Sequence, residues 1–499
     1  MEEVNIAKRI ISLIIFLALF AVSALRINTV LNYQDDVHSR AEFSQFYSLP
    51  SDILDAVWIG SSSVQEFAIA PVMYKENGIA LYPMAFGNLP FNATRFLITE
   101  IEKTQDPEVY LVDIRQLAYN CIWEESIRRV TDNMAWSDNK VKAIQTMTSD
   151  WVRYYDKSGV DLNEFHFSFY KYHNRSNDLS EADFVEDKNS FLGYFVKYGV
   201  SPFNYKEIKA RFDAPEIPIP EETQHYLSDF LDFCDALGKE VIFTCTPNCL
   251  SEDKFAMYNY AKRIITNRGY EMWDLNLEAE SIGLDYSMDF IDPMHTNNCE
   301  AEKVSKYVAD KLQQQFGFAN HQGDKKYHVY EEMFEKYSRK SKEVRLSKTT
   351  NFDEYLFKLK ELNGYTAILS VRDIQGYSLT QEQADLLKAL GFDNADTLLE
   401  HEYHSFVGVI DGKTVVAQNI GNGDNGDGNT EYHGMLNDMN ISVTSQTLHS
   451  GDKSSINVSG KEYSKNMRGF NIVVVDNTTG EVIDSVSFDT HVPEFTCTR

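Results

Sequence analysis

The stretch Ala56-Val57-Trp58-Ile59-Gly60-Ser61-Ser62-Ser63-Val64 decides the fold expected for most of this chain. Apolar, strand-forming residues lead to Gly60, and serines follow immediately. This pattern is typical of a buried strand that ends in a tight turn and lifts a side chain above the edge of a sheet. A serine in such a turn can act as a nucleophile when a base reaches its hydroxyl group.

A candidate base lies far downstream, within Asp289-Phe290-Ile291-Asp292-Pro293-Met294-His295. A histidine can take the proton of a serine hydroxyl, while a carboxylate on its other ring nitrogen fixes the tautomer and stabilises the imidazolium. Asp292 and His295 are close enough in sequence to meet on one turn. We therefore predict a catalytic site made of Ser62, His295 and Asp292. An Asp-x-x-His segment alone is a weak signal, because a helix cap beside a surface histidine has the same sequence.

Predicted strands and helices alternate around these two motifs. The alternation predicts a parallel α/β sheet, in which sites form beyond the carboxyl ends of the strands. Residues 121–220 interrupt it with many aromatic and charged residues, and we interpret them as a helical insertion that either roofs the site or only packs. Strands are expected at 52–60, 79–88, 108–114, 239–247 and 271–275, and helices at 64–74, 93–102, 221–237, 254–268 and 301–316.

The order of these motifs resembles the SGNH/GDSL hydrolase superfamily over residues 51–316, which implies a three-layer fold around a parallel sheet. Gly60-Ser61-Ser62 stands where the family has Gly-Asp-Ser, so the resemblance implies that Ser62 is the nucleophile. Gly87 fits the block whose backbone N–H binds the oxyanion together with that of Ser62, and Asp292–His295 fits the last block. The Gly-Ser-Ser variant with a membrane anchor is most similar to the DltD-like branch, which contains a teichoic-acid D-alanylation protein.

The chain departs from this family at the third block, where Gly-x-Asn-Asp is expected and Val112-Asp113-Ile114-Arg115 stands. The asparagine that would complete the oxyanion hole is absent, and Asn88 is the candidate substitute. Losing one such donor typically lowers the rate by about 10²–10³. Three explanations stay open: another donor, a labile substrate, or a fold that has lost catalysis.

The resemblance implies an acyl-enzyme on Ser62 that passes its acyl group to water or to a sugar hydroxyl. The expected substrate is an acylated cell-surface glycopolymer, such as a polysaccharide or a teichoic-acid-like polymer. The alternative is a non-catalytic surface protein for binding, adhesion or assembly, whose serine site is degenerate. A membrane-tethered signalling ligand is a third class.

Length, charge and the first residues set the compartment. A chain of 499 residues predicts two domains, and a net charge of −28 disfavours nucleic acid as a partner. Residues 1–9 read as a cytoplasmic tail, 10–26 as a transmembrane anchor and 27–50 as a helical stalk, which places the bulk of the chain outside the membrane. A cleaved signal peptide with a small-residue site at 22–24, or a buried core helix, are the alternatives.

Neither a cofactor nor a metal ion is expected. The six cysteines form no pair of CxxC units, although Cys245 and Cys249 could bridge across the turn between them. Residues 423–429 depart from the calcium-binding EF-hand pattern, so a hairpin loop is the better interpretation. The histidines His401, His404 and His433 do not form a ligand set by their spacing.

A second domain is expected after a polar linker at 317–350, because the composition becomes β-rich with glycine turns. Residues 351–493 resemble the interleukin-like EMT inducer (ILEI) family, most distinctively in Arg468-Gly469-Phe470-Asn471-Ile472-Val473-Val474-Val475-Asp476. The resemblance implies a β-sandwich that binds glycan, with Arg468 and Tyr432 as candidate contacts. A structural salt bridge is the alternative role for Arg468.

Overall fold

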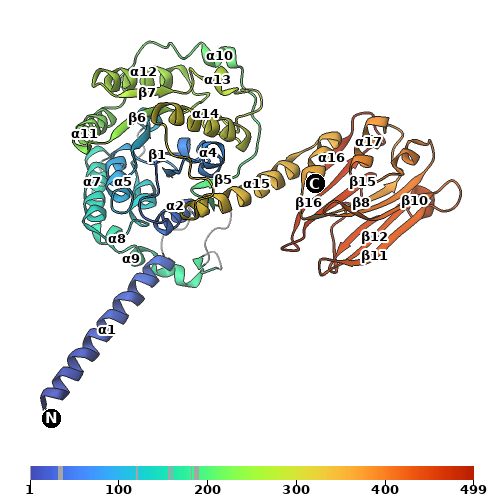
Figure 1. Cartoon of the computed structure of the whole chain (residues 1–499), viewed down its shortest axis with the longest axis horizontal. Coiled ribbons are helices and arrows are strands. Elements are labelled where there is room, and N and C mark those ends of the chain that lie inside the picture. The colour runs from blue at the N-terminus through green and yellow to red at the C-terminus, as the bar shows by residue number, and fades with distance from the viewer. Residues whose placement is uncertain are drawn as a thin grey trace. The chain divides into compact units, whose positions relative to one another are not determined.

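The computed structural model describes residues 2–31, 37–119, 122–155, 159, 161–180, 183–184 and 190–499. The chain divides into two compact units, Met1–Ser338 and Arg339–Arg499, drawn in blue to yellow and in orange to red in Figure 1. Parts of the predicted stalk and of the predicted insertion, including Cys121, lie outside the described residues.

The chain begins with the long helix α1 (Glu2–Leu31). Within it, Lys8–Leu31 has a mean hydropathy of 2.6 and none of its apolar window is buried. These 24 residues would extend about 36 Å, which exceeds the roughly 30 Å of bilayer hydrocarbon. The helix is therefore long and apolar enough to cross a membrane, a description that a signal sequence also meets. It extends beyond the span predicted at 10–26, because the helix continues past Arg26.

The first unit is built on a five-stranded sheet with the order β2-β1-β3-β6-β7. Every neighbouring pair is parallel, as the alternation of strands and helices predicts. The chain order reverses between β1 and β3, and ligand sites of such sheets lie at this point, beyond the carboxyl ends of the strands. The strands are β1 (Ala56–Gly60), β2 (Leu81–Ala85), β3 (Val109–Asp113), β6 (Glu240–Cys245) and β7 (Glu271–Asp274).

Helices cover both faces of this sheet, so the central strands are apolar on both sides. Along β1, Val57 and Ile59 point into one core, and Ala56 and Trp58 point into another. The first core is closed by α5 (Thr94–Ile101), α7 (Asp138–Tyr155), α11 (Glu221–Leu237) and α12 (Glu252–Asn267), and the second chiefly by α14 (Asn298–Phe316) (Figure 1).

The helix predicted at 64–74 is instead two helices, α3 (Ser62–Gln65) and α4 (Ala70–Asn77). Pro71 occupies the first turn of α4, and Ile69 before it has a non-helical backbone. Proline is tolerated in a first turn, but it cannot donate the hydrogen bond that a continuous helix needs. The break limits α3 to one turn, which begins at Ser62 after the N-cap Ser61 and the last β1 residue Gly60.

The predicted insertion is mainly helical, with one small hairpin among its described residues. Polar residues 317–350, predicted as a linker, contain the 21-residue helix α15 (His328–Lys348). The remaining elements of the first unit are α2 (Val37–Ser48), η1 (Phe91–Ala93), η2 (Arg115–Ala118), α6 (Glu124–Thr131), α8 (Leu162–His166), α9 (Ser168–Tyr172), η3 (His173–Asn177), β4 (Ser190–Phe191), β5 (Tyr194–Phe195), α10 (Tyr205–Lys209), α13 (Ala279–Ile282) and η5 (Lys325–Tyr327).

The second unit contains one curled ten-stranded sheet, in which β8 pairs with β9, β12 and β15. The prediction of a β-rich domain is confirmed, but the strands form one hydrogen-bonded sheet, which α16 (Phe352–Glu361) and α17 (Gln381–Ala389) cover on one face (Figure 1). The other elements are β8 (Tyr365–Asp373), η6 (Ala395–Leu399), β9 (His404–Asp411), β10 (Thr414–Asn422), β11 (Asn429–Leu436), β12 (Met439–Thr447), η7 (Leu448–Ser450), β13 (Ser454–Val458), β14 (Lys461–Glu462), β15 (Gly469–Asp476), β16 (Val482–Asp489) and β17 (Thr496–Thr498).

Candidate active site

The three serines after β1 have different surroundings. Ser61 and Ser63 are fully buried, and their hydroxyl oxygens lie 3.0 Å apart. The Ser63 hydroxyl donates a hydrogen bond to Asp113 Oδ1 at 2.8 Å. Ser62 is partly exposed, so it is the serine of this turn whose hydroxyl can meet a substrate.

The structure brings the predicted residues Ser62, His295 and Asp292 together. Ser62 Oγ lies 2.9 Å from His295 Nε2, and His295 Nδ1 lies 2.9 Å from Asp292 Oδ2. The other carboxylate oxygen of Asp292 accepts hydrogen bonds from the backbone N–H groups of Met294 (2.7 Å) and His295 (3.0 Å). Asp292 therefore closes its own turn and orients the imidazole with the same side chain.

The electrostatics of Asp292 favour its charged form. Burial alone would raise the pKa of this carboxyl group, but hydrogen bonds from the His295 ring and the Met294 N–H outweigh it and lower the pKa. The side chain of His295 is 26% exposed and that of Asp292 is 46% exposed. The carboxylate is thus ionised near neutral pH and can stabilise positive charge on the ring.

Arg115 holds the loop that carries His295, a role that sequence reasoning missed. Its guanidinium group is completely buried and donates hydrogen bonds to Met294 O, to Thr246 Oγ1 (2.8 Å) and to Pro247 O (3.0 Å). One side chain therefore links the end of β6 to the residue just before His295. An arginine directly after an apolar strand was the available signal, because a buried arginine needs several acceptors.

Asp113 holds the serine turn in place through hydrogen bonds. Its Oδ1 accepts from Ser63 Oγ and from the N–H of Arg115 (3.1 Å), and its Oδ2 accepts from the N–H of Thr246 (3.0 Å). The block in which the sequence departs from the SGNH pattern thus ties the serine turn to the neighbouring strand ends.

The predicted oxyanion residues lie at the same edge of the sheet. Ala85 pairs with Gly60, which places Gly87 and Asn88 beside the serine turn. Among the described residues, no acceptor is found for the backbone N–H of Ser62 or Gly87. Asn88 has a left-handed backbone (φ 55°), and no hydrogen bond within the described residues joins it to Ser62 or His295.

The insertion contacts both halves of the site. Arg129 on α6 donates to Gly87 O at 2.7 Å. Further along the insertion, the N–H of Ser201 donates to Phe290 O at 2.7 Å, and Lys197 O accepts from the N–H of Asn298 at 2.9 Å. These contacts place described parts of the insertion against the oxyanion block and against the His295 loop.

The two predicted glycan contacts lie in the second unit. Arg468 forms a two-pronged ion pair with Asp489, with Nη2 2.7 Å from Oδ2 and Nε 3.0 Å from Oδ1. The structural salt bridge given above as the alternative role of Arg468 is therefore present. Tyr432 on β11 is partly buried against one face of the sheet. Cys245 and Cys249 are both free and buried, so the alternative disulfide does not form.

Comparison with known proteins finds similarity in the second unit. A family model described as Interleukin-like EMT inducer (ILEI) matches residues 468–496. No curated protein matches the chain. A solved structure described as a gut microbial diltiazem-metabolizing enzyme is similar at 11% identity and a TM-score of 0.27, over 79% of this chain and 57% of that chain. This chain therefore spans 57% of the length of that protein. The match at 468–496 covers β15, β16 and the start of β17, so the second unit carries an ILEI segment.

Proposed function

We propose that the first unit is a serine esterase or O-acyltransferase of the SGNH/GDSL type, similar to the DltD-like branch. The observation that carries the proposal is the relay from Ser62 through His295 to Asp292, with both links at 2.9 Å and the serine and histidine 233 residues apart in sequence. Its position at the reversal of strand order, beyond the carboxyl ends of β1 and β3, supports the same reading.

In the proposed reaction, Ser62 Oγ attacks the carbonyl carbon of an ester while His295 Nε2 takes the hydroxyl proton. Asp292 stabilises the resulting imidazolium through Nδ1–H. The tetrahedral intermediate collapses, the C–O bond to the leaving alcohol breaks, and His295 returns the proton to that alcohol. Water or a second hydroxyl then attacks the acyl-serine with His295 as the base, which regenerates Ser62.

The negative oxygen of the intermediate needs hydrogen-bond donors. The backbone N–H groups of Ser62 and Gly87 are the proposed donors, and their lack of acceptors among the described residues supports this assignment. Asn88, next to Gly87 in the chain, is the proposed third donor.

The proposed substrate is an acylated cell-surface glycopolymer, a polysaccharide or a teichoic-acid-like polymer, met outside the membrane. The second unit, built on one curled sheet, is proposed to be a relative of the ILEI family that binds glycan. Helix α1 would anchor the chain, and exposed aromatic side chains support an anchor over a cleaved signal. Trp136, Phe167, Phe169 and Tyr170 are 37–58% exposed, and Asn28 Oδ1 of α1 accepts from the N–H of Phe169 at 2.9 Å. Aromatic residues beside a membrane helix favour the bilayer interface.

A fluorophosphonate probe tests the proposal, because it reacts only with an activated serine. Mass spectrometry of the labelled full chain is expected to find the adduct on Ser62. Ser62→Ala is expected to abolish labelling, and Asp292→Asn is expected to slow it by about 10⁴-fold, since the imidazole loses its orienting carboxylate. Ser63→Ala is the matched control: it removes a buried hydrogen bond to Asp113, so it lowers stability but keeps the adduct on Ser62.

Absence of an adduct on the folded wild-type chain would reject the enzyme and favour a non-catalytic binding protein. An adduct that forms equally fast in the Asp292→Asn variant would contradict the relay.

A further inference from the structure

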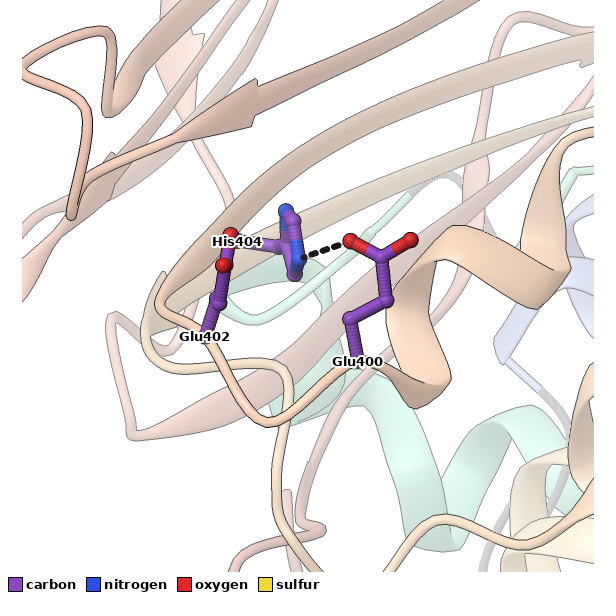
Figure 2. Close-up of side chains that lie close together, drawn as sticks. All are labelled: Glu400, Glu402 and His404. Atoms are coloured by element: carbon purple, nitrogen blue, oxygen red, sulfur yellow. Dashed lines mark ion pairs between the residues drawn. The ribbon is translucent and has the colours of Figure 1, made fainter.

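A second cluster of chemically active side chains lies in the second unit, far from the serine in sequence. Glu400, Glu402 and His404 occupy every second position from the residue after η6 to the first residue of β9. One carboxylate oxygen of each glutamate and a ring nitrogen of His404 lie within 4.8 Å of one another. Figure 2 shows the two carboxylates on either side of the imidazole.

The burial and hydrogen bonding of His404 make this arrangement informative. The ring is 2% exposed, and its Nδ1 lies 3.2 Å from the carbonyl oxygen of Gly421. A carbonyl oxygen can only accept, so Nδ1 carries a proton, and Nε2 is the ring nitrogen left to face the two carboxylates. Nε2 is buried and has no hydrogen-bond partner among the described residues. It faces Glu400 Oε2 at 3.6 Å, which is too long for a hydrogen bond.

The backbone of the cluster is fixed by one fully buried side chain, Gln375. Its Nε2 donates to the carbonyl oxygens of Glu400 (3.2 Å) and Glu402 (2.9 Å), and its Oε1 accepts from the N–H of His404 (2.9 Å). The amide of Asn422 also donates to the Glu402 carboxylate. The backbone of the cluster and the Glu402 carboxylate are thus held in place before any ligand arrives, as in preorganised metal sites.

We propose that Glu400, Glu402 and His404 bind a divalent transition-metal ion, with Zn²⁺ as the best match. Two anionic carboxylates and a nitrogen lone pair that converge on one point repel each other unless a cation lies between them. The mixed imidazole and carboxylate set suits Zn²⁺ better than Ca²⁺ or Mg²⁺, which prefer oxygen ligands alone. The contact from Nδ1–H to Gly421 O is the outer hydrogen bond that metal-bound histidines make.

Three protein ligands leave a coordination position open for water or for an oxygen of a bound molecule. The Glu400 side chain is 60% exposed, so solvent reaches the site. The site lies outside the matched ILEI segment at 468–496. The proposal departs from the expectation that this chain binds no metal, which weighed the cysteine pattern, the loop at 423–429 and the spacing of the histidines but left out the glutamates near His404.

The competing explanation is a doubly protonated His404 in an ion pair with Glu400, and metal binding separates the two. The full chain in detergent is stripped with a chelator and titrated with Zn²⁺ by calorimetry, and retained metal is measured by mass spectrometry. The wild type is expected to retain a single equivalent and to unfold at a higher temperature with Zn²⁺. Glu400→Gln and Glu402→Gln keep the side-chain size and are expected to weaken binding at least about tenfold.

The matched control is Glu431→Gln, because Glu431 and His433 form an exposed pair at 3.5 Å in the same unit. It is expected to bind Zn²⁺ as the wild type does. A wild type that retains no metal and shows no thermal shift would overturn the proposal in favour of the ion pair. Equal affinity in wild type, Glu400→Gln and Glu402→Gln would overturn it as well, since the ion would then be bound elsewhere.

Discussion

Three consecutive serines at the end of β1 show how position decides what one residue type can do. Ser61 and Ser63 bond to each other and to Asp113 beneath the turn, while Ser62 faces His295. The buried pair fixes the turn, and the fixed turn sets the direction of the Ser62 hydroxyl. A hydroxyl group with a fixed direction would suit the proposed role of Ser62 as a nucleophile, because a small misplacement of a reacting group lowers the reaction rate by a large factor.

Arg115 gives the sharpest prediction at this scale. Arg115→Met removes hydrogen bonds to Met294, Thr246 and Pro247 and leaves their buried acceptors unsatisfied. We expect the free energy of unfolding to fall by roughly 3 kcal/mol. We also expect kcat for a small ester to fall more than KM changes, because the segment carrying His295 loses its support. Urea unfolding and steady-state kinetics at a temperature where the variant stays folded measure both effects.

Arg211→Met is the matched control for Arg115. Arg211 donates to Cys249 O (3.3 Å) and Leu250 O (2.7 Å) in the loop after β6. Within the described residues it has no hydrogen bond of its own to residues 289–295, which the loop reaches only through the Cys249 N–H to Pro293 O (2.8 Å). The Arg211→Met variant is expected to have a lower free energy of unfolding than the wild type and nearly the same kcat. If both variants reduce kcat equally, Arg115 acts on stability alone.

Sequence could predict that Ser62, His295 and Asp292 come together, because the proposed acyl transfer needs a nucleophile, a base and an orienting carboxylate, which occur in characteristic local patterns. It could not supply Arg115 or Asp113, whose roles depend on which strand ends become neighbours. Nor could it pair Glu400 with His404, since the argument there rests on burial and on the hydrogen bond from Nδ1.

At the scale of the element, α14 connects the site to the rest of the unit. Asn297 caps it by accepting from the N–H groups of Cys299 (3.0 Å) and Glu300 (3.3 Å). Along the helix, the Ser305 hydroxyl donates to Phe67 O at 2.9 Å, next to the serine turn. The helix therefore joins the His295 loop at its start to the segment after α3.

Glu300 in the first turn of α14 predicts a pH dependence of stability. Both of its carboxyl oxygens are buried without a hydrogen-bond partner among the described residues. Burial, assisted by the negative charge of Asp289, raises the pKa of Glu300 well above its usual value. The folded chain therefore binds a proton that the unfolded chain has released, so stability falls as pH rises through this window.

Glu300→Gln keeps the size of the side chain and removes its titration. The variant is expected to lose less stability than the wild type when the pH is raised from about 5 to about 8. Denaturant midpoints at several pH values measure the two slopes. The control is Glu302→Gln on the same helix, whose carboxylate accepts from Tyr337 Oη at 2.6 Å. Parallel curves for the wild type and Glu300→Gln would show that Glu300 is ionised in the folded chain.

Helices and strands could be predicted from the sequence where either one face or the whole element is buried. The helix expected at 221–237 is α11 (Glu221–Leu237), and the strands expected around β3 and β6 are found. The sequence pattern did not predict strands β11, β12 and β13, and the burial pattern of β11 shows the reason. Along Asn429–Leu436, exposed residues alternate with only half-buried ones, so the hydrophobic contrast that reveals a strand is weak.

At the scale of the whole molecule, the chain combines a long apolar helix with two separately packed units. The resemblance to the ILEI family is expected over residues 351–493, and the family model matches 468–496, which covers the end of that range and extends slightly beyond it. The segment that matches contains β15, the strand next to β8 at the centre of the curled sheet.

The apolar helix predicts where the protein resides. Lys8 and Arg9 flank its start, so basic residues are expected on the cytoplasmic side and both units outside. The full-length chain is expected in the membrane fraction after washing with high salt and alkali, with an intact mass that includes residue 1. A mature chain that starts near Ala24 would instead establish a cleaved signal peptide.

A pair of charge substitutions in this helix separates anchoring from other forms of membrane association. Phe16→Arg with Leu19→Arg places two charges near the centre of α1, each costing about 2.5–3.5 kcal/mol, so the variant is expected to leave the membrane fraction. The matched control, Leu25→Arg with Ile27→Arg, adds the same charges near the helix end, where long side chains reach the interface and binding persists. If the central variant stays membrane-bound, the exposed aromatic residues around Phe167 hold the protein to the bilayer without α1. If both variants leave the membrane, charge alone and not its depth decides the location.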